Sequence, residues 1–370
     1  MARPLPTAIA RPEERRPAWA PALLIPLVAL LAYGAAIAVI AVAAGPTLGY
    51  DFKAYLHAGQ RLLDGARLYD PAVNVAGGFA IFLYPPPFAL AMVPFALLPG
   101  TIAVTAWTVL LALAFLAGVA LLPVRREVRW LVVLLAALQW PFLYSIKLGQ
   151  VGPLLFLAFA AGWRWLDRPG PLGLSMAAGT LIKLQPGLLF GWALAGGRRR
   201  AIAIGVIAIA ACALAGTLVT GLAAWSDYVA ILRRVSAPVT TPHNFTPGAV
   251  AYQMGASEAA ASLVQWASMA LTIAITAYAW LRSDAETAYV VTAVASQLLS
   301  PLLWDHYAML LLIPTALLLQ RRQWWAVLIP LSAWLPLPWI IPVAFAPGLV
   351  GPLLTGSSDC PGSVDVGSGA

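Results

Sequence analysis

Long apolar runs, separated by short clusters of arginine, proline and glycine, make up most of this chain. Several runs approach the ~20 residues that an α-helix needs to cross the hydrocarbon core of a bilayer. Hydrophobic residues make up 61% of the 370 residues, whereas soluble domains typically contain about 45–50%. The sequence therefore predicts an all-α, polytopic transmembrane helical bundle, because a membrane β-barrel would show short alternating segments instead.

The ends of the apolar runs predict eleven spans. Two of them, on either side of Lys183, have only 12 and 13 residues, and Pro186 interrupts the second near its start. A single broken span over 171–196 is the alternative there. The expected spans are 19–44, 101–122, 130–146, 151–166, 171–182, 184–196, 201–222, 258–281, 286–301, 307–320 and 324–345.

The arginine clusters favour eleven spans, because lysine and arginine collect in the cytoplasmic loops of membrane proteins. With a cytoplasmic N-terminus, eleven crossings place every cluster on the cytoplasmic side, whereas a single crossing at 171–196 does not. The net charge of +8 is then explained by topology, and no basic soluble domain for nucleic acid is visible. The clusters contain Arg3, Arg11, Arg15, Arg16, Arg125, Arg126, Arg129, Arg164, Arg168, Arg198, Arg199, Arg200, Arg282, Arg321 and Arg322.

The domain organisation follows from the same pattern. Residues 1–18 are expected to be a cytoplasmic leader, because they are too polar for a cleaved signal peptide, and 19–345 the membrane domain. Its first outer loop covers 45–100, in which the short apolar stretch 84–100 is expected to be interfacial or re-entrant. The small polar residues of 346–370 predict a disordered outer tail. The two cysteines do not suggest a disulfide framework or a metal site.

This topology places rare polar residues on the outer side, including all three lysines and all three histidines of the chain. Lysines on that side oppose the usual charge bias. A polar group at membrane depth costs several kcal/mol unless it lines a cavity or finds a partner. The pattern therefore predicts a functional site. The alternative is that Lys183 has no functional role and extends its side chain to the water interface.

The chemistry of that site is constrained by the motifs that the chain lacks. No HExxH, GxxxxGK[ST] or GxSxG motif and no paired-cysteine motif occurs. Outer-face carboxylates and cations suit a reaction between lipid-linked substrates, in which a carboxylate takes a proton and cations stabilise a departing phosphate. A transporter or flippase that binds an anionic lipid-linked substrate at Lys183 is the alternative, although no repeated halves are visible. A non-catalytic scaffold leaves the one-sided polar residues unexplained.

Five segments, in order, resemble motifs of glycosyltransferase family 87. These membrane enzymes of the GT-C type are similar to polyprenyl-phosphate-mannose-dependent α-1,2-mannosyltransferases of actinobacterial envelopes. The resemblance extends over about residues 20–345 and implies the GT-C fold, with interfacial helices on the outer face. The segments are DFKAYLHAGQRLLDGARLYDP, FLYPPPFALAMVPFALLP, KLGQVGPLLFLAFAAGW, TLIKLQPGLLFGWAL and SPLLWDHYAMLLLIP.

The resemblance implies roles for individual residues. Asp51, which opens the first outer loop, matches the catalytic base. Lys183 and His306 are expected at the donor phosphate, and Gln150 as a hydrogen-bonding partner of the sugar. Gly152 departs from the family, in which many relatives carry asparagine, so a side-chain contact from that position is not expected.

Other residues are weaker candidates, each with an ordinary structural alternative. Asp51 itself suits the N-cap of a helix over 52–65, and Asp64 and Asp70 are expected to be scaffold. Trp304 and Tyr307, beside Asp305 and His306, suit an interfacial aromatic belt. Possible substrate-binding residues are Tyr84, Tyr55, His57, Lys147, Gln185, Asp305, and, for the acceptor, His243 and Asn244.

Taken with the resemblance, the residues predict an inverting glycosyltransferase that moves a hexose, with mannose expected, from a polyprenyl phosphate to a glycolipid or envelope glycan. The expected location is the bacterial plasma membrane, with the site on the periplasmic side. The expected partners are the lipid bilayer, the lipid-linked donor and the acceptor, without nucleic acid. No cofactor and no structural metal are expected. Whether a divalent cation binds loosely at the phosphate stays an open question.

Overall fold

The computed structural model describes residues 19–70, 81–234, 239–241 and 244–332. Every regular element in these ranges is a helix, and they contain no strand, which confirms the all-α prediction. The expected leader at 1–18, the outer tail at 346–370 and most of the last expected span lie outside the described residues.

Four helices in the described ranges are long and apolar enough to cross a bilayer alone. A bent pair, α5 and α6, with 67° between its members, makes a fifth candidate. The expected number of eleven crossings is not confirmed by these lengths and stays a prediction. The four are α1 (Trp19–Ala44), α4 (Gly100–Leu121), α10 (Arg199–Thr220) and α13 (Glu258–Arg282), and the pair is α5 (Arg126–Leu138) with α6 (Trp140–Leu148).

The long helices expose apolar side chains, as a membrane-embedded bundle requires. Val42 on α1 is 82% exposed, Leu218 on α10 is 79% exposed and Leu281 on α13 is 79% exposed. Such surfaces are unfavourable in water, and the hydrocarbon of a bilayer covers them without cost. The chain is therefore a polytopic membrane protein.

Shorter helices fill the middle of the bundle. Between α8 and the turn η2, Lys183 has extended backbone angles (φ −150°, ψ 140°), so two separate helices replace a continuous span. The break fits both the two short spans that the arginine clusters favour and a single broken span, so the choice between them stays a prediction. The elements are α7 (Gly152–Arg164), α8 (Pro169–Ile182), η2 (Gln185–Gly187), α9 (Leu188–Ala195), α14 (Ala285–Leu298), η3 (Asp305–Leu311), α15 (Leu312–Gln320), η4 (Trp324–Val327) and α16 (Leu328–Leu331).

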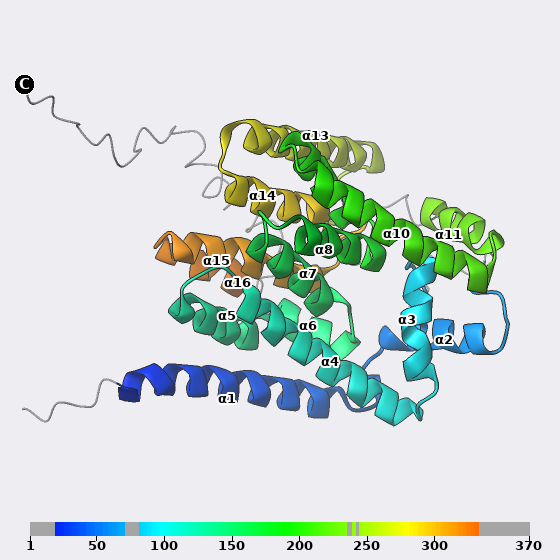
Figure 1. Ribbon diagram of the computed structural model, residues 1–370, viewed down its shortest axis with the longest axis horizontal. Helices are drawn as coiled ribbons and strands as arrows, with labels where there is room; N and C mark the ends of the chain where they lie inside the picture. Colours follow the sequence, from blue (N-terminus) through cyan, green and yellow to red (C-terminus); the bar gives the residue numbers. More distant parts are fainter. Residues whose placement is uncertain (1–18, 71–80, 235–238, 242–243, 333–370) are drawn as a thin grey trace, which may run out of the picture.

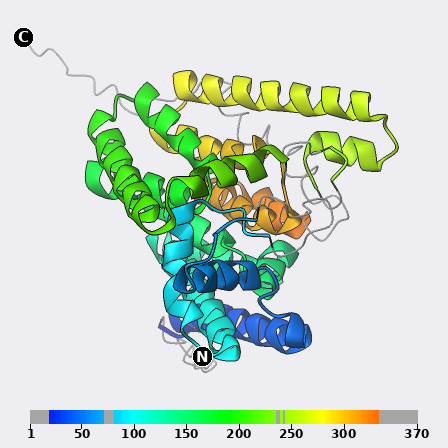
Figure 2. The ribbon, with the colours of Figure 1, turned by 90° about the vertical axis from the view of Figure 1, so that its right-hand side faces the viewer.

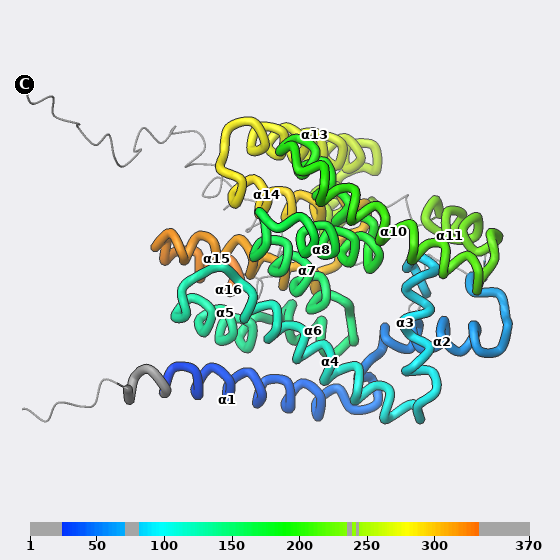
Figure 3. The backbone as a smooth tube through the Cα atoms, viewed as in Figure 1, coloured from blue at the N-terminus to red at the C-terminus, as the bar shows by residue number. Residues whose placement is uncertain are grey.

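Helices from two distant loops gather at one end of the long helices, on the right in Figure 1 and facing the reader in Figure 2. Figure 3 follows the chain from α1 into α2 and α3 and back along α4. Arg67 donates two hydrogen bonds to Asp227, at 2.8 Å and 2.6 Å, and so joins the first loop to α11. The elements of the two loops are η1 (Gly45–Thr47), α2 (Phe52–Leu63) and α3 (Pro86–Ala96) in the first, and α11 (Ala223–Arg234) and α12 (Pro247–Gln253) in the second.

Arginine clusters meet at the other end of the bundle. Arg125, just beyond the C-terminal end of α4, donates to the carbonyl oxygen of Leu319 at 3.2 Å. Arg198 donates to the carbonyl oxygen of Leu166 at 3.4 Å, and Arg321 pairs with Asp284 at 3.2 Å. These contacts bring together clusters that are far apart in the chain, and the side of the membrane that they face stays a prediction.

Candidate functional site

The end of α6 fixes the start of α2. Gly149 ends α6 in the left-handed conformation, with φ of +73°, which glycine adopts without the steric penalty of a Cβ atom. The turn leaves the last carbonyl groups of α6 free to accept hydrogen bonds. The carbonyl oxygen of Lys147 accepts from the N–H of Gly49 at 2.8 Å, and that of Leu148 accepts from the N–H of Asp51 at 2.9 Å.

Asp51 stands at the N-cap position of α2, but its side chain makes no capping hydrogen bond. The interpretation of Asp51 as a side-chain cap is therefore wrong. Its half-buried carboxylate instead accepts a hydrogen bond at Oδ2 from Gln150 Nε2, at 2.6 Å. Burial raises the pKa of Asp51 above its ordinary value, while the Gln150 hydrogen bond and the nearby His306 act to lower it.

Two buried tyrosines hold the other end of Gln150. Its Oε1 atom accepts hydrogen bonds from the hydroxyls of Tyr55, at 3.0 Å, and Tyr84, at 3.1 Å. These two hydroxyls lie 2.7 Å from each other, and Tyr84 also interacts with Tyr307. The structure thus brings Asp51, Gln150, Tyr55 and Tyr84, all predicted site residues, into one network.

His306 lies on another side of the same carboxylate. It is 3% exposed, and its Nδ1 atom lies 3.7 Å from Oδ1 of Asp305. Its buried Nε2 atom has no hydrogen-bond partner among the described residues. A buried polar atom without a partner is unfavourable, so this ring nitrogen is available for a ligand. Burial lowers the pKa of His306, against the opposing effect of Asp305.

Lys183 brings an amino group to the same cluster. Its Nζ atom lies 3.5 Å from the centre of the Tyr307 ring, a cation–π contact. It forms no ion pair with an acid in the part of the chain that the structure describes. Burial lowers the pKa of Lys183 to about 7, and its charge also acts to lower the pKa of His306.

The aromatic-belt interpretation is wrong for Tyr307. The side chain is 1% exposed, and its ring lies 4.4 Å from that of His306 while supporting Lys183. The sequence analysis missed Tyr307 as a site residue. Its position directly after His306, in WDHY, was the available signal.

Other candidates lie nearby, with protein contacts of their own. Lys147 Nζ lies 5.6 Å from the ring centre of Tyr144, whose ring is 6.3 Å from that of His306. Gln185 donates from Nε2 to Ser300 Oγ at 2.9 Å, while its Oε1 atom is buried and has no partner among the described residues. Lys147 therefore borders the cluster through Tyr144, whereas Gln185 is held by Ser300, and the part of both residues in substrate binding stays a prediction.

Some candidates are not brought into the cluster. His57 is exposed on α2, whereas Tyr55 on the same helix is buried, and His243 lies outside the described residues. Asn244 is fully buried and uses its side chain to hold backbone groups: its Oδ1 accepts from the N–H groups of Thr246 and Leu303, at 3.1 Å and 3.0 Å. This geometry gives Asn244 a structural role.

The backbone of Gly152 lies against two neighbouring side chains. A Cβ atom at this position would lie 2.6 Å from Met309 Sδ and 2.9 Å from Ser145 Oγ. A larger residue at this position would therefore require the side chains of Met309 on η3 and Ser145 on α6 to shift.

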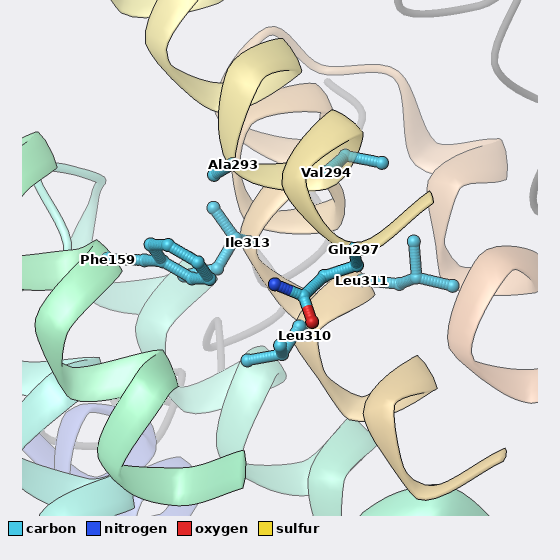
Figure 4. A pocket seen from close by; sticks show the side chains of 7 residues that line it. All are labelled: Phe159, Ala293, Val294, Gln297, Leu310, Leu311 and Ile313. Atoms are coloured by element: carbon cyan, nitrogen blue, oxygen red, sulfur yellow. The ribbon is translucent and has the colours of Figure 1, made fainter. Parts of the chain in front are cut away.

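A separate cavity between α7, α14 and α15 does not serve as the site. Figure 4 shows its lining, in which Gln297 is the polar member among apolar side chains. Its volume of about 10 Å³ is close to the least that one water molecule needs. No group of three or more His, Cys, Asp or Glu residues gathers to hold a metal ion in the described ranges.

Comparison with protein families gives one match. The model of glycosyltransferase family 87 matches residues 82–301, which is more than half of the chain. Comparisons with curated proteins and with solved structures found no match. Asp51 lies before the matched residues and His306 after them, whereas Gln150 and Lys183 lie within. The chain belongs to glycosyltransferase family 87.

Proposed function

We propose that this glycosyltransferase transfers a hexose, with mannose as the expected sugar, from a polyprenyl phosphate to a glycolipid or glycan acceptor. One observation carries the proposal. A half-buried carboxylate, Asp51, shares a site with two nitrogen atoms that can meet a phosphate. Among the described residues, His306 Nε2 is buried without a hydrogen-bond partner, and the Lys183 ammonium group lies over the Tyr307 ring and forms no ion pair.

Asp51 is the group that fits the general base. An acceptor hydroxyl attacks the anomeric carbon while its proton passes to the Asp51 carboxylate. The new glycosidic C–O bond forms as the bond between that carbon and the phosphate oxygen breaks. Attack from the face opposite the phosphate inverts the anomeric carbon, so a β-linked donor gives an α-linked product.

Lys183 and His306 fit the departing phosphate. Two negative charges collect on the polyprenyl phosphate as its bond to the sugar breaks, and nearby cations stabilise that charge. Lys183 brings an ammonium group supported on the Tyr307 ring, and His306 Nε2 can donate a hydrogen bond when it carries a proton. The proposed chemistry uses no cofactor, and a divalent cation would enter only together with the phosphate.

The polyprenyl chain suits the apolar surfaces of the long helices, where Leu218 on α10 is 79% exposed. We place the reaction on the non-cytoplasmic side of a bacterial plasma membrane. The support is the separation between the arginine clusters at one end of the bundle and α2, α3 and α11 at the other.

The test is transfer by the purified protein in liposomes. The donor is polyprenyl phosphate carrying a ¹³C-labelled β-mannosyl group, and the acceptor is a lipid extract from cells that lack the protein. We expect a labelled glycolipid with an α-linked sugar by NMR. Movement of intact donor across the bilayer without any new glycosidic bond would support the flippase alternative and contradict the proposal.

A further inference from the structure

The contacts of Gln150 assign it a part that differs from sugar binding. The side chain is 8% exposed, and its two ends are occupied by groups of opposite hydrogen-bonding character. An amide oxygen only accepts and an amide nitrogen only donates. Two hydroxyl donors at Oε1 therefore fix the amide orientation and direct Nε2 toward Asp51.

The result is an asymmetric carboxylate. Oδ2 of Asp51 accepts from Gln150 at 2.6 Å, and Gln150 is the side chain that hydrogen-bonds this carboxylate among the described residues. Oδ1 stays available for another donor. The backbone N–H of Asp51, bound to Leu148 at 2.9 Å, holds the residue from the other direction.

We propose that Gln150 is the positioning residue of this site, held by Tyr55 and Tyr84 so that it fixes Oδ2 of Asp51 and leaves Oδ1 for the acceptor hydroxyl. This inference rests on the proposed function for the identity of the base. Tyr55 and Tyr84 then act through Gln150. The orientation of the base depends on hydroxyls from two parts of the first outer loop, on residues 29 positions apart in the chain.

Removal of the Gln150 amide changes the titration of Asp51 in a predictable direction. A hydrogen bond to the charged carboxylate favours that form, so its loss raises the pKa of Asp51 further. The other titratable groups that face or feel Asp51 are His306 and Tyr307 on η3, Tyr144 on α6, and the two tyrosines. All of them are retained in Gln150→Leu.

The experiment follows the Asp51 carboxyl band by infrared difference spectroscopy against pH, with Asp51→Asn to assign the band. We expect Gln150→Leu to raise the titration midpoint by about one pH unit. Tyr55→Phe combined with Tyr84→Phe should raise it similarly, because the freed amide can rotate. In a Gln150→Leu background, the two Phe substitutions should add no further shift, since residues that act as one unit are not additive.

Gln139→Leu is the matched control. Gln139 is a fully buried glutamine that bonds Ala308 O at 3.1 Å and is not part of the Asp51 network. It should leave the Asp51 midpoint unchanged. Two results would overturn the positioning role of Gln150. One is an Asp51 midpoint that does not change in Gln150→Leu. The other is a further full shift of that midpoint when the two Tyr→Phe substitutions are added to Gln150→Leu. The midpoint is measured without turnover, so this failure is distinguishable from a loss of the proposed function, which Asp51→Asn turnover tests separately.

Turnover then separates positioning from substrate binding. With polyprenyl phosphate mannose as donor, Gln150→Leu should lower kcat about 10- to 100-fold and leave the donor KM nearly unchanged. A raised KM at unchanged kcat would instead make Gln150 a sugar-binding residue and contradict the inference.

Discussion

The backbone N–H of Asp51 donates a hydrogen bond to the carbonyl oxygen of Leu148 at 2.9 Å, and this contact joins α2 to α6. The residue that follows Leu148 is Gly149, whose φ of +73° turns the chain away and leaves that carbonyl accessible. Gly149 also accepts from Trp107 Nε1 at 2.7 Å through its own carbonyl oxygen. One glycine therefore sets where the proposed base stands.

Substitution Gly149→Ala should lower both stability and turnover. A left-handed alanine costs about 1–2 kcal/mol, and the added Cβ would lie 2.8 Å from Phe52 Cβ on α2. The control is Gly197→Ala, which has φ of +69° but no heavy atom within 4 Å of the added Cβ. Thermal unfolding should show a larger loss for Gly149→Ala, and only that variant should lose transfer activity. Equal effects from the two variants would contradict the positional argument.

Lys183 should give the reaction an alkaline limb. Its pKa, lowered by burial to about 7, means that the ammonium group is present below that pH and lost above it. Asp51 must be ionised, so activity should also fall as the pH drops through its raised pKa. The expected profile of kcat/KM for the donor is bell-shaped.

Lys183→Arg provides the check, because arginine stays charged over the whole range. The variant should move the alkaline limb upward while the acid limb stays in place. An alkaline limb that does not move assigns that ionisation to another group and removes Lys183 from the phosphate site.

His306 should contribute at the leaving phosphate through Nε2. His306→Phe retains a ring in the buried space but removes the nitrogen that has no protein partner among the described residues. Loss of one donor to a developing anion typically costs about 100-fold in kcat. The control His57→Phe changes an exposed histidine on α2 and should retain activity. Steady-state transfer assays compare the two variants, and similar activities would contradict the role of His306.

The ion pair between Arg67 and Asp227 should stabilise the first outer loop without taking part in chemistry. Asp227 is 6% exposed, so Arg67→Leu leaves a buried carboxylate without its partner. We expect faster hydrogen exchange in α2 and α11 and an unchanged pH profile of the remaining activity. Arg126→Leu, at an exposed arginine on α5, should leave exchange in both helices unaffected. Exchange that matches the unsubstituted protein in Arg67→Leu would contradict the prediction.

Periodicity and charge parity predicted much of the architecture. Some helix ends follow the predicted run boundaries closely, as in α4 at Gly100–Leu121 against 101–122. The span predicted over 130–146 is instead two helices, α5 and α6, with 67° between them. The break near Lys183 was predicted from the two short apolar runs and from Pro186, and the structure confirms that the helix ends there. The number of crossings is harder to predict from the sequence. A helix as short as α9 cannot cross a bilayer on its length alone, so its position in the membrane depends on packing against its neighbours.

The sequence pointed to most of the residues that the structure brings together, but not to the contacts between their side chains. Lys183 and His306 are rare polar residues in an apolar chain, whereas the resemblance to family 87 singled out Asp51 and Gln150. Their hydrogen-bond partners depend on contacts over long separations, such as the 99 positions between Gln150 and Asp51. A local pattern suggested a cap for Asp51, and the resemblance suggested a sugar contact for Gln150, whereas tertiary packing joins the two residues.

The most direct test of the central claim is the turnover of Asp51→Asn with labelled polyprenyl phosphate mannose. Asparagine retains the shape of the side chain but cannot take a proton from the acceptor. Asp64→Asn, at the exposed end of α2, is the matched control. We expect Asp51→Asn to fold and to bind the donor with nearly unchanged affinity, yet to lose at least about 100-fold in kcat, while the control stays active. Turnover of Asp51→Asn close to that of the unsubstituted protein would contradict the account.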